Sequence, residues 1–420
     1  MKIGVFIPIH FPGGTLRLGK NIAKMLNHSL SKNVNTPVKV IFGNPNSAYS
    51  LHEDLKDLLN EGIEVVDFRW KKISQLEARQ LCQQMGRDAD LKMDQYVVPS
   101  GGTSDFKDLD YWLFITDRIF DIFIPIKRSG IIVTDYIQRY VPGIFDINDQ
   151  RHYQAVPHRL IRNTRNADEA FALSPGTQGD LKVFAGCTEG TLLPLVVDDD
   201  FMQVKLGAAS AAVEKKNQFV WVTNTTQHKN HINTLNGLIE YYRHGGKLDC
   251  VVTGVQTDAF DPKWQGTSEG DAHLPYQKQI REMIAGNPEL SSRIKIRGHV
   301  SDDKYIEELS QSYFLLHSVI ADNGTYSIIE AARLGIPAVS SRYPQQEYIC
   351  ELFGIKPVFF DPFDSKDLAK SLLSAQAGDF FSAINMEKIE KRLWKNMANE
   401  FCRDFISAVK EDKPRKKLYG

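Results

Sequence analysis

Short apolar runs rich in β-branched residues alternate with amphipathic stretches along almost the whole chain. This alternation is typical of parallel sheets whose strands are joined by helices that cover both faces. In the first half it predicts strands at 2–8, 38–42, 64–68, 131–134, 169–173 and 192–197. In the second half it predicts strands at 218–223, 250–254, 294–297, 313–318, 338–341 and 358–360. We therefore expect two doubly wound α/β units, the second with a six-stranded sheet of its own.

The pattern restarts after about residue 200, where three acidic residues precede the small-residue stretch 207–212, which is typical of a linker. We therefore place one domain at 1–200 and a second at 201–385. Apolar residues at helical spacing predict a helix over 386–410, followed by a basic tail that we expect to be frayed and solvated.

Composition narrows the class of protein. With 420 residues, 42% hydrophobic and 25% charged, the chain can bury full cores, which excludes a disordered or miniature protein. Lys and Arg (51) nearly balance Asp and Glu (52), so no overall field attracts nucleic acid, and an anionic ligand needs a local site. We expect no nucleic-acid partner.

The five cysteines are scattered and form no C-x-x-C pair, so the sequence predicts neither a disulfide framework nor a thiolate metal site. A reducing, cytoplasmic location fits this usage. Charged residues interrupt the most apolar stretch, 111–137, so we expect no membrane-spanning helix.

Open α/β sheets bind ligands at the carboxyl ends of their strands, so the loops that follow strands are the candidate sites. The first such loop contains Gly13, Gly14 and Thr15 ahead of a predicted helix, where backbone N–H groups can approach an anion. A simple tight turn remains the alternative. The dinucleotide and P-loop glycine fingerprints are absent.

A second loop, NTTQHKNH at 224–231, follows the strand 218–223 and precedes a helix. Lys229 offers a cation for a diphosphate, and Asn224, Thr225 and Thr226 add hydrogen-bonding groups. A solvated lysine in a helix-opening turn is the alternative.

A third segment, 315–341, carries a buried strand, a polar turn with Asp322, a helix with Glu330, and Gly335 and Pro337 before the next strand. Ser327 and Glu330 also have the spacing of a capping box, which would give Glu330 a purely structural role.

Taken together, these segments resemble retaining glycosyltransferases of family four, which have the two-domain GT-B fold. Asp322 and Glu330 match the carboxylates of the family's E-x(7)-E signature, and Gly335 and Pro337 match the G-x-P after it. Further matches are the Gly13-Gly14 loop, the turn His228-Lys229-Asn230, the stretch 296–318 and the turn 360–362. The resemblance covers most of the chain and implies two Rossmann-like domains that face each other across a cleft.

The resemblance also implies roles for individual residues. Glu330 would accept hydrogen bonds from ribose hydroxyls, Asp322 would hold hydroxyls of the donor sugar, and Lys229 would neutralise the departing diphosphate. Further donor contacts would come from the helix N-terminus at 324–326, from the two turns already described and from the loop after strand 294–297. These residues are Gly14, Thr15, Asn224, Thr225, His299, Val300, Gly324, Thr325 and Tyr326.

Three departures from the family's pattern concern the chemistry. The first signature carboxylate is Asp322 where the family has Glu, and no Arg stands a few residues before Lys229. The family's His-Asp pair in the first domain appears as Thr134-Asp135, so Asp135 is a candidate catalytic residue without its histidine.

An alternative interpretation is a metal-dependent glycosyltransferase of the GT-A type, because such enzymes hold Mn²⁺ or Mg²⁺ through a D-x-D motif. The matches are 198–200 and 108–110, and in a chain with this many acidic residues such matches arise by chance. We expect no metal site.

The resemblance implies a metal-independent retaining glycosyltransferase without a cofactor, in which a UDP- or GDP-linked hexose is passed to a hydroxyl of a glycan or lipid-linked glycan. A catalytically degenerate nucleotide- or glycan-binding protein and a nucleotide-sugar epimerase are the alternatives. The fold also implies that 386–410 crosses back to the first domain, while the basic tail offers weak contact with the inner face of an anionic membrane. The oligomeric state stays open.

Overall fold

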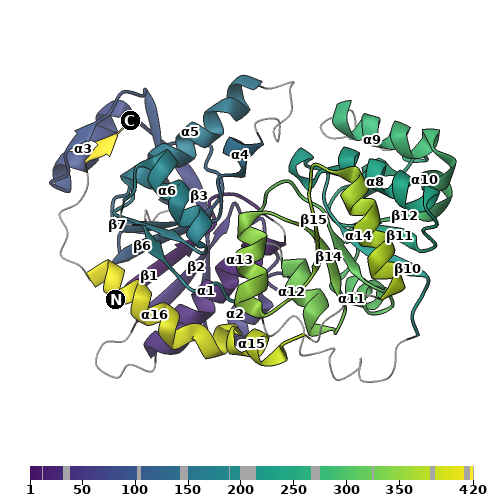
Figure 1. The fold of residues 1–420 in the computed structure, drawn as a ribbon. Helices are drawn as coiled ribbons and strands as arrows, with labels where there is room; N and C mark the ends of the chain where they lie inside the picture. The colour runs from purple at the N-terminus through teal and green to yellow at the C-terminus, as the bar shows by residue number, and fades with distance from the viewer. Residues whose placement is uncertain are drawn as a thin grey trace. The chain divides into compact units, whose positions relative to one another are not determined.

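The computed structural model describes residues 1–11, 13–31, 38–101, 106–141, 150–188, 190–198, 214–265, 275–323, 326–378, 384–410 and 417–419. Within this part, the chain divides into two compact units (Figure 1). Unit 1 takes Met1–Arg139, Asp149–Asp199 and Lys391–Gly420, and unit 2 takes Tyr140–Asn148 and Asp200–Glu390. Each unit is described by itself.

Unit 1 is built on an eight-stranded sheet with the order β5-β3-β2-β1-β6-β7-β8-β9, parallel except where β3 meets β5. The strands are β1 (Lys2–Phe6), β2 (Lys39–Pro45), β3 (Glu64–Ser74), β5 (Gln95–Ser100), β6 (Tyr111–Thr116), β7 (Arg128–Val133), β8 (Glu169–Ala172) and β9 (Thr191–Leu192).

Two strands of this sheet were not predicted from the sequence, β5 and β6. Strand β6 lies between β1 and β7, and all six of its residues are buried. A strand that is buried on both faces has no alternation of apolar and polar residues. In the sequence it therefore cannot be separated from the apolar residues that follow it. The continuous strand predicted at 192–197 is wrong, because the strand there is only Thr191–Leu192 and Val197 forms an isolated parallel bridge with Leu393.

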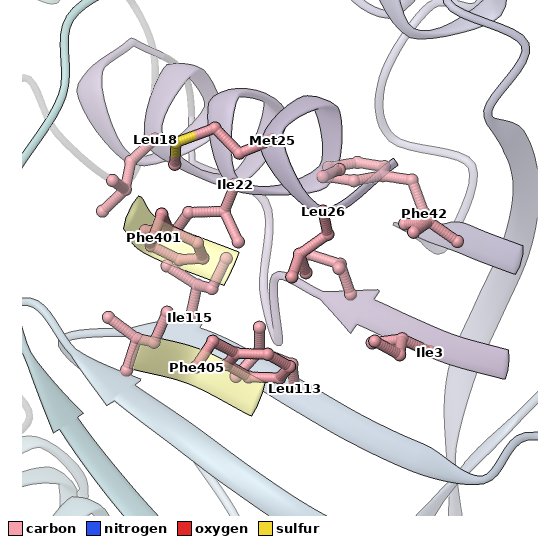
Figure 2. Close-up of a cluster of buried hydrophobic side chains, with 14 of the residues drawn as sticks. Ile3, Leu18, Ile22, Met25, Leu26, Phe42, Leu113, Ile115, Phe401 and Phe405 are labelled. Carbon is pink, nitrogen blue, oxygen red and sulfur yellow. The ribbon is translucent and has the colours of Figure 1, made fainter. Parts of the chain in front are cut away.

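Helices cover the sheet of unit 1. They are α1 (Gly14–Ser31), α2 (Lys56–Asn60), α3 (Gln75–Gln84), α4 (Ile137–Tyr140), α5 (Gln150–Asn166), α6 (Pro175–Ala185) and α16 (Trp394–Lys410). Side chains of α1, α16 and the strands β1, β2 and β6 meet in one apolar cluster (Figure 2). The residues labelled there are Ile3, Leu18, Ile22, Met25, Leu26, Phe42, Leu113, Ile115, Phe401 and Phe405.

The helix predicted over 386–410 is interrupted. Helix α15 spans Met386–Lys391 and α16 begins at Trp394. Between them the Val197 N–H donates to the Arg392 carbonyl at 3.1 Å, and the Trp394 N–H donates to the Val197 carbonyl at 3.1 Å. This pairing with an extended segment replaces helical hydrogen bonds at the break.

The end of the chain is held by unit 1, so the expectation of a frayed tail is wrong for 417–419, while 413–416 lie outside the described residues. Strand β16 (Leu418–Tyr419) pairs in parallel with β4 (Ala89–Asp90). Lys417 forms an ion pair with Asp88 at 3.1 Å, and Leu418 is fully buried in a cluster with Ile73.

We expect Leu418→Ala to lower the free energy of unfolding of unit 1 by about 1–2 kcal/mol. This is less than the usual 2–5 kcal/mol for a buried leucine, because a terminal strand can detach without opening the rest of the core. Urea denaturation followed by tryptophan fluorescence measures the change. Leu76→Ala, on the exposed face of α3, is the matched control. An equal effect of both substitutions would contradict an anchoring role for Leu418.

Unit 2 contains a six-stranded, fully parallel sheet with the order β12-β11-β10-β13-β14-β15, which confirms the six strands predicted for the second half. The strands are β10 (Gln218–Val222), β11 (Asp249–Thr253), β12 (Ile294–Gly298), β13 (Leu315–His317), β14 (Ala338–Ser341) and β15 (Val358–Phe360).

The helices of unit 2 are α8 (His231–Arg243), α9 (Pro275–Gly286), α10 (Pro288–Arg293), α11 (Asp302–Ser310), α12 (Tyr326–Arg333), α13 (Pro344–Phe353), α14 (Ser365–Ala377) and α15, with the short 3-10 turns η3 (Gln227–Lys229) and η4 (Thr257–Phe260). Leu235 and Leu238 of α8 pack with Leu368 and Leu372 of α14 in the core of the unit. Across the described segments of both units, we find no helix with the length and apolarity that a membrane crossing requires.

Candidate functional site

The carboxyl edge of the unit 2 sheet is held together by backbone contacts between its neighbouring strands. The Thr223 N–H donates to the Thr253 carbonyl and the Gly254 N–H to the Gly298 carbonyl, both at 3.0 Å. The Thr253 hydroxyl donates to the same Gly298 carbonyl at 3.0 Å. Gly254 has φ +139°, and a Cβ there would lie 1.7 Å from the Thr223 oxygen. Only glycine therefore fits at this crossing.

Lys229 lies at this edge, in the loop after β10. It ends the short turn η3, and Asn230 behind it adopts φ 61°, so the chain turns sharply before α8 begins. The Asn230 amide donates to the Pro362 carbonyl at 2.7 Å, which joins this turn to the loop after β15. Two loops separated by more than a hundred residues therefore fix the position of Lys229.

Asp322, in the loop after β13, meets Lys229 directly. The Lys229 ammonium donates a hydrogen bond to Asp322 Oδ2, and both side chains are mostly buried. His228 Nε2 lies 4.0 Å from the same oxygen, and the Ile320 N–H donates to the His228 carbonyl at 2.8 Å. The structure therefore brings together two residues that the sequence placed 93 positions apart.

The charges around Asp322 determine its protonation. Burial raises the pKa of this carboxyl, but the Lys229 ammonium and the neighbouring His228 together outweigh burial and hold the pKa well below its usual range. His317, which is also buried, has its pKa lowered to about 3 by burial and by the nearby Lys229, so it is neutral at pH 7. The pair at the edge is thus a carboxylate and an ammonium.

We expect the stability of unit 2 to fall in acid because of Asp322. A carboxyl whose pKa is lowered on folding stabilises the fold above its unfolded pKa of about 4, and this contribution is lost as the pH falls. Urea unfolding at about pH 6 and about pH 3 should show a smaller loss for Asp322→Asn than for the wild type. An identical loss in both proteins would show that Asp322 is not stabilised as a carboxylate.

Glu330 lies in α12 and accepts a hydrogen bond from the Tyr305 hydroxyl at 2.8 Å. Ser327 is inside the same helix, and its hydroxyl makes no hydrogen bond within the described residues. The capping box suggested by the Ser327–Glu330 spacing is therefore not formed.

The remaining predicted residues of unit 2 have varied surroundings. Asn224 Oδ1 accepts from the Thr226 N–H at 3.0 Å, and the Thr225 hydroxyl donates to Gln256 at 3.1 Å, so both side chains shape the loop after β10. His299 is exposed and Val300 is half-buried, directly after β12. Tyr326 opens α12, whereas Gly324 and Thr325 lie outside the described residues.

The predicted residues of unit 1 lie at the carboxyl edge of its own sheet. Gly13 has φ +87° and accepts the first backbone hydrogen bond of α1, from Arg17 at 3.1 Å, while Gly14 and Thr15 begin the helix. Asp135 follows β7 and is 8% exposed. Its Oδ1 accepts from the Ile137 N–H at 3.0 Å, so this carboxylate also caps α4.

Sequence reasoning gave no role to three residues of the unit 2 site, although it named His228 as part of the turn around Lys229. His228 adjoins Lys229, and that adjacency was a usable signal. His317 and Tyr305 gave none, because the electrostatic influence of Lys229 and Asp322 on His317, and the hydrogen bond from Tyr305 to Glu330, are tertiary effects that no local pattern encodes.

The structure describes all three residues of only one of the two D-x-D motifs. At 108–110, Asp110 accepts from the Lys2 N–H at 2.7 Å and Asp108 pairs with the Lys2 ammonium at 3.4 Å. Asp199 and Asp200 of the other motif lie outside the described part. Within that part, no three His, Cys, Asp or Glu side chains are grouped as a metal ion would require.

No family model and no curated protein sequence matches the chain. Solved structures do share its fold over nearly the full length. HepE from Anabaena in complex with UDP-glucose is 16% identical, with 97% of this chain and 100% of that chain covered and a TM-score of 0.60. A sucrose-phosphate synthase from Thermosynechococcus elongatus (11%, 97% and 98%, 0.59) and a glycosyltransferase from Rickettsia africae (13%, 98% and 99%, 0.58) are similar too. The chain therefore has the α/β GT-B fold.

Proposed function

We propose that the protein is a metal-independent retaining glycosyltransferase, which transfers a hexose from a UDP- or GDP-linked donor to a hydroxyl of a glycan or lipid-linked glycan. The observation that carries the proposal is the contact between Lys229 and Asp322 at the carboxyl edge of the unit 2 sheet. Open α/β sheets bind ligands at the carboxyl ends of their strands, and a structure with a similar fold holds UDP-glucose. We therefore expect the donor at this edge.

In this proposal, Lys229 and Asp322 contact different parts of the donor. An ammonium has three N–H donors, so Lys229 can contact a diphosphate while one donor stays on Asp322. Asp322 then orients the ammonium and presents its carboxylate to sugar hydroxyls. Glu330 takes the ribose, and His299 and Val300 lie against the base.

Further contacts complete the proposed donor site. At the start of α12, Tyr326 is proposed to offer its backbone N–H to the diphosphate. The resemblance assigns the same role to Gly324 and Thr325, which lie outside the described residues. Asn224 and Thr225 support the loop that holds Lys229. For unit 1, considered by itself, the resemblance assigns donor contacts to Gly14 and Thr15 at the start of α1 and a catalytic role to Asp135. No cofactor is needed, since the nucleotide sugar is a co-substrate.

The proposed reaction uses no side-chain nucleophile. The bond between the anomeric carbon and the diphosphate oxygen breaks while the acceptor oxygen bonds to the same face of that carbon. The acceptor proton passes to the departing diphosphate, whose developing charge Lys229 stabilises.

The test is a panel of UDP- and GDP-linked sugars incubated with the protein in EDTA and followed by NMR, with water as the acceptor. We expect slow release of nucleoside diphosphate from one donor, with the sugar first appearing in the anomeric configuration of the donor. Appearance of the opposite anomer first would contradict retention, and a requirement for a divalent cation would contradict metal independence.

A binding protein without activity is the second candidate, and Thr134 is the observation that favours it. Its hydroxyl contacts Asp135 at 3.4 Å, where the family has a histidine. Nucleotide binding in the same panel, with no release of sugar from any donor, would support this candidate. Isomerised donor without any release would indicate an epimerase.

A further inference from the structure

The Tyr305 hydroxyl donates a hydrogen bond to the Glu330 carboxylate, and no role has yet been assigned to it. We propose that Tyr305 is a positioning residue, which sets the Glu330 carboxylate to accept both hydroxyls of a ribose and so makes the site selective for ribonucleotides. This inference rests on the proposed function, because it assumes that a nucleotide binds at this edge.

Burial makes the contact between the two residues significant. Tyr305 and Glu330 are each only 8% exposed, and the hydroxyl lies 2.8 Å from Glu330 Oε2. A hydrogen bond to a charged acceptor is stronger than one between neutral groups, and it fixes the direction in which the remaining lone pairs of the carboxylate point. A buried carboxylate is also costly to the fold, so stability alone does not explain why α12 carries one here.

Tyr305 lies in the sequence between the residues proposed to hold the base and the residue proposed to hold the ribose. Helix α11 is capped by the Ser301 hydroxyl, which accepts from the Lys304 N–H at 3.4 Å, so the helix starts directly after His299 and Val300. Tyr305 therefore connects the loop proposed to hold the base with the helix proposed to hold the ribose. In a nucleoside these two groups are joined by a single bond, so their binding groups must keep a fixed spacing.

A capping box does not hold the Glu330 carboxylate. The Ser327 hydroxyl, the partner that a capping box would use, makes no hydrogen bond in the described structure. The Tyr305 hydroxyl holds the carboxylate through a contact between two helices, α11 and α12, and removing this phenol oxygen should loosen it.

The experiment is isothermal titration calorimetry with UDP and GDP and with their 2′,3′-dideoxy analogues, which lack both ribose hydroxyls. It compares the wild type with Tyr305→Phe, Glu330→Ala and the double variant. We expect Tyr305→Phe to weaken binding of the preferred ribonucleotide about 3–10-fold, the size of one hydrogen bond, and to leave the dideoxy analogue unaffected. In the Glu330→Ala background, Tyr305→Phe should have no further effect, because it acts through the carboxylate.

Tyr241→Phe is the matched control. It also removes the hydroxyl of a buried tyrosine in unit 2. This hydroxyl donates to Gln376 at 2.5 Å and accepts from the N–H of Leu248, just before β11, at 3.1 Å. It should lower stability without changing the ratio of ribonucleotide to dideoxynucleotide affinity. If Glu330→Ala fails to fold, the change in this ratio on Tyr305→Phe alone decides.

The possible outcomes distinguish an error in the role of Tyr305 from an error in the proposed function. If Glu330→Ala reduces the ratio and Tyr305→Phe does not, the role of Tyr305 is wrong and the proposed function stands. If Tyr305→Phe weakens the dideoxy analogue as much as the ribonucleotide, Tyr305 has only a structural role. If the wild type binds neither UDP nor GDP, the proposed function is wrong, and this inference falls with it.

Discussion

Lys229→Ala lowers kcat/KM for the nucleotide sugar by about 100–1,000-fold, the usual cost of removing one charged group that stabilises a developing anion. The ammonium that would meet the departing diphosphate is gone, and no Arg stands in the preceding loop to replace it. The same substitution leaves the buried Asp322 carboxylate without its ion-pair partner, which should cost unit 2 about 3 kcal/mol of stability. Steady-state release of nucleoside diphosphate and urea denaturation measure the two effects separately.

Two comparisons distinguish chemistry from folding in this prediction. The double variant Lys229→Ala/Asp322→Ala should recover part of the stability and none of the activity, because it removes the unpaired charge but restores no cation. Lys247→Ala removes an exposed lysine of the same unit and should change neither quantity. Wild-type kcat/KM in folded Lys229→Ala would rule out Lys229 as the group that stabilises the diphosphate.

Gly254→Ala is expected to destabilise unit 2 by about 4 kcal/mol or more, which places it among the most severe single substitutions. An added Cβ would overlap the Thr223 carbonyl oxygen, and φ +139° is strained for any residue with a side chain. The backbone cannot move aside without loss of the hydrogen bonds that tie Thr223 to Thr253 and Gly254 to Gly298. Thermal and urea denaturation should show a large shift for the transition of unit 2.

Gly286→Ala is the control for this substitution. A Cβ at Gly286 meets no other atom within 4 Å, and its φ lies outside the strained region, so the free energy of unfolding should change little or rise. Similar stability of both variants would show that the carboxyl edge is not packed as described.

The sequence predicted unit 2 better than unit 1, for reasons that lie in the strands themselves. In unit 2, short β-branched strands such as Asp249–Thr253 are separated by clear helices, so each run has visible ends. In unit 1, Tyr111–Thr116 is the strand beside β1, yet it lies in a long apolar stretch whose subdivisions depend on tertiary pairing. The break at Arg392–Leu393 is also tertiary, since it follows from pairing with Val197.

The candidate site shows the same division between local and tertiary information. The rule that ligands bind at the carboxyl ends of strands predicted the loops of Lys229 and Asp322, and the structure brings these side chains into contact. Local spacing could not distinguish a functional Glu330 from a helix cap. The Ser327 hydroxyl, which makes no hydrogen bond within the described residues, shows that the cap is absent, and Glu330 accepts from Tyr305, 25 positions away.

The most direct test of the central claim is calorimetric titration of UDP and GDP into the wild type and Lys229→Ala in the presence of EDTA, with the monophosphates UMP and GMP as reference ligands. The account predicts that one diphosphate binds the wild type without metal, that it binds Lys229→Ala at least about tenfold more weakly, and that the monophosphate is affected less. Equal affinity of both proteins for the diphosphate would contradict the account.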